Sequence, residues 1–193
     1  MAKTKYVTVA HQDDIYEPDY AGECIRQADE AADTIIVFSD YGELRDGKKT
    51  DNNKLLKVKR LLLLPLKISF FGKKIFERNR FVRRRILSLG NAICCPSVTF
   101  NTELVKKEVF SSPMKSNVDW AAWEEYSGEK GRFVYADKVL MYHRIHEEST
   151  TSELIHDDNR TKEDYEMFCK FWPKWIARLL LRWYSKSQES NKL

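Results

Sequence analysis

Three segments that lie far apart along the chain contain the side chains that a group-transfer site needs. Residues 11–14, with the sequence His-Gln-Asp-Asp, directly follow a strand-like run, and Asp119 stands just before a helix-like run. A third segment, residues 142–151, mixes imidazole, guanidinium and hydroxyl groups after another strand-like run. The first could hold a metal ion, the second could act as a base and the third could bind phosphate. Together they predict a transferase site.

The adjacent carboxylates of Asp13 and Asp14 could bind a divalent cation at the end of a strand. Carboxylate oxygens are suitable ligands for Mg²⁺ or Mn²⁺, and two of them leave coordination positions for the oxygens of a diphosphate. Either side chain could instead cap a following helix, since acidic residues are common at helix starts. Both interpretations stay open for this pair.

Asp119 precedes an aromatic-rich run and also has two interpretations, a helix cap or a general base. As a base it would have to lie within hydrogen-bond reach of an acceptor hydroxyl. Trp120 and Trp123 lie three residues apart on one face of the expected helix, where they could stack on a sugar or pack in the core. Asp119 is therefore a candidate catalytic base, and the two tryptophans are candidate acceptor-binding residues.

The third segment places charged and polar side chains at the end of an expected strand. Because side chains alternate along a strand, Arg144 and His146 should lie on one side and His143 on the other. Arg144 could neutralise a phosphate, and His146 could bind a metal. The alternative is an exposed strand end with ordinary polar residues, in which the hydroxyls of residues 149–151 cap the next turn.

The composition of the 193 residues indicates one folded domain. Hydrophobic residues make up 42% of the chain and aromatic residues 12%, which argues against intrinsic disorder. The four cysteines show no Cys-x-x-Cys spacing, which favours a reducing, cytoplasmic environment. The N-terminal run is too short and too polar for a signal peptide, and no stretch approaches the roughly 20 apolar residues that cross a bilayer.

Positive charge is concentrated in the middle of the chain. Residues 54–85 are strongly basic, whereas residues 1–46 and 117–166 are rich in acidic side chains. This asymmetry predicts an anionic partner near the middle segment. A nucleic acid fits poorly, because aromatic residues are sparse there and the four leucines at 61–64 are unsuited to reading a groove. A membrane-surface helix or a lid fits better, and a solvated basic face is the alternative.

Hydrophobic periodicity predicts an α/β fold. A strand over 6–10, a helix over 20–32 and a strand over 34–39 form a unit that is typical of a parallel sheet, and Asp46-Gly47 predicts a turn after it. Pro65 interrupts the basic segment, which should form two short helices or a helix and a loop. The remaining expected elements are strands over 93–100, 132–136 and 139–143, helices over 102–109 and 120–128, and C-terminal helices over 162–187 that are broken near Pro173.

In this order, the segments resemble motifs of the inverting family 2 glycosyltransferases, which have the GT-A fold, and in particular of bacterial polysaccharide-type members. Residues 11–18 look like the acidic metal motif of that family with the proline-bearing turn after it, and residues 38–41 are similar to the next strand and its exit. Residues 118–123 resemble the helix that carries the base, and residues 142–151 resemble the late arginine-histidine motif. His11 stands where the family has its usual first aspartate.

The resemblance implies a role for each candidate residue. The metal ligands would be Asp13, Asp14 and His146, the diphosphate-binding residues Arg144 and His11, the base Asp119, and the acceptor-binding residues Trp120 and Trp123. Val118 replaces the usual acidic neighbour of the base. The cofactor would be Mn²⁺ or Mg²⁺, the donor a nucleotide sugar, and the acceptor a saccharide or a lipid-linked molecule. One in-line displacement would invert the anomeric carbon, with placement and charge stabilisation supplying most of the catalysis.

The resemblance begins at the metal motif, whereas family members carry a further segment before it that binds the nucleotide. We therefore expect a single truncated domain over 1–193, a partial GT-A mixed sheet flanked by helices, with a helical C-terminal segment. Its expected parts are a metal-motif unit over 1–52, a basic segment over 53–90, an acceptor-side catalytic region over 91–155 and helices over 156–193.

Such an acceptor-side half would expose a sheet edge and an apolar face, which favours a partner subunit or a homodimer. The alternative to an enzyme is a non-catalytic binding or assembly module. The expected location is cytoplasmic, with peripheral contact at the inner membrane face through residues 54–85, and no nucleic acid is expected as a partner.

Overall fold

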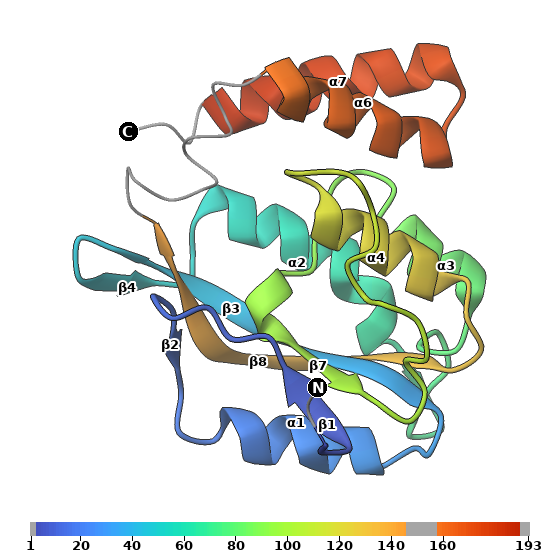
Figure 1. The fold of residues 1–193 in the computed structure, drawn as a ribbon. Helices are drawn as coiled ribbons and strands as arrows, with labels where there is room; N and C mark the ends of the chain where they lie inside the picture. The colour runs from blue at the N-terminus through green and yellow to red at the C-terminus, as the bar shows by residue number, and fades with distance from the viewer. Residues whose placement is uncertain (1–2, 146–157, 190–193) are drawn as a thin grey trace.

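A mixed sheet of six strands forms the centre of the molecule (Figure 1), which is a computed structural model that describes residues 3–145 and 158–189. The strands lie in the order β1-β7-β3-β8-β2, and β4 pairs with the end of β3. Only β3 and β8 run parallel among the described pairs. The mixed α/β fold that the sequence predicts is confirmed. The strands are β1 Tyr6–Thr8, β2 Ile15–Tyr16, β3 Thr34–Arg45, β4 Lys48–Thr50, β7 Val98–Asn101 and β8 Arg132–Ile145.

The sequence correctly places strands at both sides of the first helix, but they are not neighbours in the sheet. β7 lies between β1 and β3 and is antiparallel to both. The strand-helix-strand unit therefore contributes no adjacent parallel pair, and the expectation of a parallel sheet is wrong for these strands. Periodicity along one strand says nothing about which distant segment completes its hydrogen bonds.

β8 is one long strand where the sequence predicts two. Its register against β3 skips from Ala136 to Val139, so Asp137 and Lys138 bulge out of the ladder. Both are exposed, and each is held by an ion pair, Lys67 to Asp137 and Asp19 to Lys138. The polar pair that looks like a loop in the sequence is therefore a bulge inside a continuous strand.

Helices cover both faces of the sheet (Figure 1), with α1 Tyr20–Asp29 on one side and α2 Lys54–Lys67, α3 Arg80–Arg85 and α4 Val118–Ser127 on the other. Buried Tyr20, Cys24 and Ala28, spaced at i, i+4 and i+8, pack α1 against Val37. The C-terminal helices α6 Asp158–Phe171 and α7 Lys174–Glu189 lie over the second helical layer. The larger core cluster draws buried residues from all four expected parts of the chain.

The Asp46-Gly47 turn and the break near Pro173 are confirmed. Asp46 and Gly47 have φ values of 48° and 75°, the left-handed conformation that a two-residue hairpin turn requires between β3 and β4. Pro65, however, lies in the last turn of α2, so a single helix runs through it. The basic segment continues as a small hairpin of β5 Ser69–Phe70 and β6 Lys73–Lys74.

Two other expected elements differ from the structure. Residues 102–109 form turns and not a helix. The backbone carbonyl of Asn101 accepts the N–H groups of Leu104 and Val105, which closes one helix-like turn, but the described backbone hydrogen bonds do not continue it. The strand expected over 93–100 is shorter, since a 3-10 turn at Cys95–Ser97, which contains Pro96, precedes β7.

In the described ranges, none of the helices combines the length and the apolar character needed to cross a bilayer. All four cysteines are free thiols. His146, Ser149 and Thr151, which the sequence analysis assigns to the late motif, lie outside the described residues.

Candidate functional site

The pairing of β2 with β8 brings the first and third sequence motifs together. Ile15 lies opposite Tyr142 in this antiparallel pair, so the residue before β2, Asp14, meets the two residues that follow Tyr142. More than 120 residues of chain separate these motifs, and the pairing of the short strand β2 with β8 places them side by side. Asp14 precedes a strand and not a helix, which excludes the helix-cap interpretation for this side chain.

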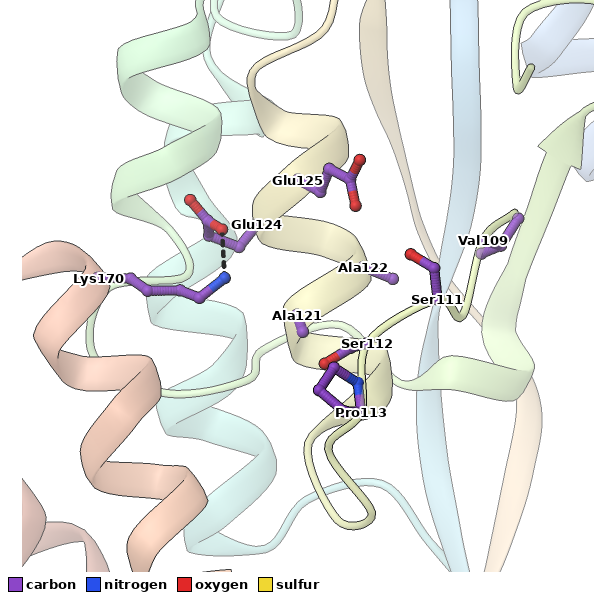
Figure 2. A pocket seen from close by; sticks show the side chains of 9 residues that line it. All are labelled: Val109, Ser111, Ser112, Pro113, Ala121, Ala122, Glu124, Glu125 and Lys170. Atoms are coloured by element: carbon purple, nitrogen blue, oxygen red, sulfur yellow. Dashed lines mark hydrogen bonds and ion pairs between the residues drawn. The ribbon is translucent and has the colours of Figure 1, made fainter. Parts of the chain in front are cut away.

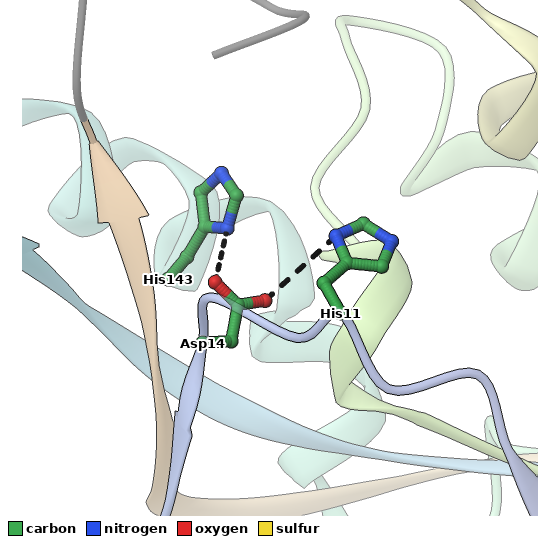
Figure 3. A group of neighbouring side chains, drawn as sticks. All are labelled: His11, Asp14 and His143. Atoms are coloured by element: carbon green, nitrogen blue, oxygen red, sulfur yellow. Dashed lines mark hydrogen bonds and ion pairs between the residues drawn. The ribbon is translucent and has the colours of Figure 1, made fainter. Parts of the chain in front are cut away.

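The carboxylate of Asp14 is fully buried and lies between two imidazole rings (Figure 3). Its Oδ1 atom accepts the backbone N–H of Arg144 at 2.9 Å and lies 2.9 Å from Nδ1 of His143. Its Oδ2 atom has no hydrogen-bond partner in the described part of the chain, and Nδ1 of His11 stands 3.8 Å from it. A buried carboxylate oxygen without a donor is costly unless something else neutralises it.

His11, Asp14 and His143 each offer one ligand atom, and the three atoms lie within 4.8 Å of one another. Two imidazole nitrogens and one carboxylate oxygen suit Mn²⁺ or a similar transition metal better than Mg²⁺, which prefers oxygen ligands alone. The unpartnered Oδ2 atom of Asp14 provides the negative charge that such an ion needs. The donor set therefore fits a divalent metal.

This group differs in part from the ligand set that the sequence predicts. Asp14 belongs to it, whereas the carboxylate of Asp13 does not. Instead, the backbone carbonyl of Asp13 accepts the Nε–H of Arg144 at 2.7 Å, which fastens the loop to β8. His11 was expected to contact the donor, and His143 was expected to face away from the other site residues. His146 lies outside the described residues.

Asp119 lies in the first turn of α4 and does not cap it, because Asn117 occupies the N-cap position. Its Oδ1 atom accepts the backbone N–H of Trp120, and its Oδ2 atom accepts the side-chain amide of Asn91 at 2.7 Å. The residue keeps a partly exposed surface, yet protein surrounds the carboxylate, and this desolvation raises its pKa. The two hydrogen bonds and the charge of Lys59 act in the opposite direction.

The thiols of Cys94 and Cys95 connect Asp14 and Asp119 electrostatically. Burial is the main cause that raises the pKa of both thiols, that of Cys95 to about 12, and the charges of Asp14 and Asp119 raise them further. The thiols are therefore neutral at physiological pH. Both carboxylates therefore raise the pKa of the same two thiols.

Lys59 supplies a cation near Cys94 and Asp119, and it is not among the predicted site residues. Its Nζ atom donates to the Tyr41 hydroxyl at 2.7 Å, and its charge lowers the pKa of both Cys94 and Asp119. It lies on α2, where lysines and arginines are interleaved with leucines in the sequence. Only its position one turn after the buried Leu56 hints that it faces inward. Asn91 gives no sequence signal of its own.

The acceptor-binding role expected for Trp120 and Trp123 is wrong for this structure, because both side chains are fully buried. Trp120 packs against Phe168 and Phe171 and donates its indole N–H to the carbonyl of Leu87. Trp123 stacks on Phe100. Neither indole face is accessible to a sugar, so the core-packing alternative holds for both.

A pocket with a volume of about 320 Å³ lies beside α4 (Figure 2), but it contains none of the predicted site residues. Its charged groups neutralise one another, since Lys170 donates to Glu124 at 3.0 Å and Arg84 forms a second ion pair with the same carboxylate. Nothing in this lining resembles a reactive constellation. The residues that line it are Val109, Ser111, Ser112, Pro113, Ala121, Ala122, Glu124, Glu125 and Lys170.

No protein-family model matches the sequence, and no curated protein matches it either. The resemblance to family 2 glycosyltransferases therefore depends on the motifs and their order alone.

Proposed function

We propose that this chain is a metal-dependent glycosyltransferase domain of the family 2 type. It would move a sugar from a nucleotide-sugar donor to a saccharide or lipid-linked acceptor with inversion. The observation that carries the proposal is the meeting of two distant motifs, because the 11–14 loop lies against residues 143–144. The charges of Asp14 and Asp119 both raise the pKa of Cys94 and Cys95, which supports a place for Asp119 near this meeting point.

In this proposal, His11, Asp14 and His143 hold Mn²⁺, which when bound would neutralise the diphosphate as it leaves. Lys59 adds a fixed positive charge to the same region, and Arg144 holds the 11–14 loop in position through the carbonyl of Asp13. A cation beside a leaving diphosphate stabilises the negative charge that develops on it.

Asp119 would accept the proton of the acceptor hydroxyl. Desolvation raises its pKa, which makes it a stronger base than an ordinary, solvated aspartate. Asn91 and the backbone N–H of Trp120 orient the carboxylate. The attack and the departure of the diphosphate then occur on opposite sides of the anomeric carbon, which accounts for inversion.

A second candidate is one half of a split transferase, or a non-catalytic module that assembles with a complete one. The supporting observation is β1, a three-residue strand at the sheet edge whose outer side pairs with no described strand. Such an edge can accept a strand from another polypeptide. Metal binding without nucleotide binding would favour this candidate.

The test is calorimetric titration of Mn²⁺, and then of uridine diphosphate with Mn²⁺, into the purified chain and its variants. We expect Mn²⁺ binding in the wild type, its loss in His143→Ala, and its retention in the control Asp29→Asn, which removes an exposed carboxylate on α1. Uridine diphosphate binding that requires Mn²⁺ would support the transferase. A folded chain that binds neither would overturn both the metal site and the transferase proposal.

A further inference from the structure

Residues 54–85 carry a charge opposite in sign to that of the rest of the chain. This segment contains twelve lysines and arginines and a single acidic residue, so its formal charge is +11, while the whole chain has +4 and the remaining residues therefore −7. The one acidic side chain, Glu77, is buried. All exposed charged side chains of the segment are therefore positive.

Several of these cations form no ion pair within the part of the chain that the structure describes. Lys67, Arg78 and Arg84 form ion pairs with carboxylates outside the segment. In contrast, five exposed side chains form no ion pair with any carboxylate of residues 3–145 and 158–189; these are Lys54, Lys57, Lys73, Arg80 and Arg85. Unpaired cations on one segment attract an anionic surface within about 10 Å at moderate salt.

The same segment exposes large apolar side chains. Leu61 and Leu64, at i and i+3, lie exposed on α2, whose buried residues are Leu56, Leu63 and Leu66, and the exposed Ile68 directly follows the helix. At the turn of the β5–β6 hairpin, Phe70 is 63% exposed and Phe71 is 89% exposed, and their rings meet edge to face at 4.6 Å. Two adjacent phenylalanines with this much exposure are unusual for a surface in contact with water alone.

The backbone of the hairpin also points to a role for the rings. Phe71 and Gly72 have φ values of 49° and 74°, so a bulky aromatic residue occupies a left-handed position that glycine or asparagine adopts more easily. The turn therefore gains nothing from phenylalanine as a backbone element. What the residue contributes is an exposed ring at the tip.

A further exposed aromatic ring of the segment lies on α3, near the α6–α7 corner. Phe81 on α3 is 67% exposed, and the guanidinium of Arg85 lies over its ring at 5.2 Å and over the ring of Trp172 at 4.6 Å. Cations interleaved with aromatic rings are typical of proteins that lie in the interfacial layer of a bilayer. We use the name basic aromatic face for the exposed surface of residues 54–85. It consists of the exposed apolar residues of 61–81 and the five cations that form no ion pair with a described carboxylate.

We propose that the basic aromatic face docks on an anionic membrane surface, with Phe70 and Phe71 entering the boundary between headgroups and acyl chains. The phosphates of a nucleic acid would neutralise the cations, but they would leave the exposed leucines of α2 in contact with water. A second copy presenting the same face would meet like charge. An anionic bilayer matches both the charge and the apolar tip, and this inference does not depend on the proposed transferase activity.

The experiment is co-sedimentation of the full chain with vesicles of phosphatidylcholine alone and of phosphatidylcholine mixed with phosphatidylglycerol. We expect binding to the anionic vesicles that weakens at high salt, and a loss on the order of tenfold or more when both rings are removed in Phe70→Ser/Phe71→Ser. Lys73→Glu/Arg80→Glu should lower binding through charge alone. Circular dichroism checks that each variant is folded, as expected for exposed positions.

Trp183→Ser serves as the matched control, because Trp183 is an exposed aromatic residue on α7, outside the basic aromatic face. Equal losses in this control and in the phenylalanine variant would overturn the assignment to this face. Unchanged binding in the phenylalanine variant, or binding to a nucleic acid oligomer with none to vesicles, would overturn the membrane proposal. The wild type could instead bind no vesicles and self-associate in a way that the phenylalanine variant abolishes. The partner of this face would then be a second copy of the chain and not a bilayer.

Discussion

Asp14 and Asp119 are both enclosed carboxylates, but the groups around them differ. Asp14 lies between two imidazoles and accepts a backbone N–H, with one oxygen left unpartnered in the described structure. Asp119 is bonded by an amide and a backbone N–H, and desolvation raises its pKa. The first environment is suited to holding a cation and the second to holding a proton. Residue type alone therefore does not assign a role; the partners do.

The largest effect that would separate the two carboxylates is expected from Asp119→Asn. Asparagine keeps the shape of the side chain but cannot accept the acceptor proton, so sugar transfer should fall by about 10² to 10⁴, while Mn²⁺ affinity stays unchanged. Transfer rates and calorimetry on the same preparation measure the two quantities. Equal transfer rates in the variant and the wild type would remove Asp119 from the base role.

Asp14→Asn should have the converse effect. Loss of the charged ligand should weaken Mn²⁺ binding by more than about a hundredfold, since residues that only support a metal ligand already contribute about 10- to 100-fold. Calorimetric titration with Mn²⁺ measures this loss, with Asp29→Asn as the exposed control. If the variant bound Mn²⁺ as tightly as the wild type, the metal would have to lie elsewhere.

Gly42→Ala should damage the Asp14 side of the site more than the Asp119 side. A Cβ atom at this position would lie 2.6 Å from the ring of Tyr142 and 2.8 Å from the carbonyl of Thr50, and Tyr142 directly precedes His143. Such overpacking typically destabilises a protein by about 1–3 kcal/mol. Chemical denaturation measures the stability, and Gly22→Ala, where a Cβ meets nothing within 4 Å, is the matched control.

The pH dependence of stability should identify the proton-binding carboxylate. Because the folded-state pKa of Asp119 is raised, the folded protein binds this proton more tightly than the unfolded chain. The contribution of Asp119 to stability is therefore most favourable at acidic pH and is lost as pH rises from its ordinary pKa to the raised one. Asp119→Asn should gain stability relative to the wild type over that window. A constant difference across the window would contradict the shift.

The smallest effect is expected from Asn91→Ala, which removes the amide that donates to Asp119. This hydrogen bond lowers the pKa of the carboxyl, so its loss should raise that pKa further and move the acidic limb of the transfer rate to higher pH. The change corresponds to about 1 kcal/mol for one hydrogen bond. A pH–rate profile measures it, and a lower rate without a shifted profile would indicate a structural role only.

Local patterns in the sequence predicted most of the elements but not their partners. The spacing of apolar residues located β3, α1 and α4, and Asp46-Gly47 and Pro173 marked a turn and a helix break correctly. The expected helix over 102–109 is wrong, because the turn that begins at Asn101 is not continued by further helical hydrogen bonds in the described structure. Whether a first turn extends into a helix depends on tertiary packing, which periodicity does not record.

The candidate site was predictable as a set of residue types and not as a set of contacts. The sequence singled out Asp14, Asp119 and Arg144 because acidic and basic side chains follow strand-like or precede helix-like runs. It assigned Asp13 to the metal and Trp120 to the acceptor, whereas the structure turns the Asp13 carbonyl to Arg144 and buries Trp120. An aromatic residue beside a site looks the same in sequence whether it faces a ligand or the core.

By itself the sequence determined the mixed α/β class, the order of the motifs and the concentration of positive charge in residues 54–85. These properties depend on composition and on spacing along the chain, which no folding alters. Only the tertiary structure decided that β2 pairs with β8, that His143 and not Asp13 joins His11 and Asp14, and that Lys59 faces inward. Such contacts join residues far apart in the chain, so the packing of the whole domain selects them.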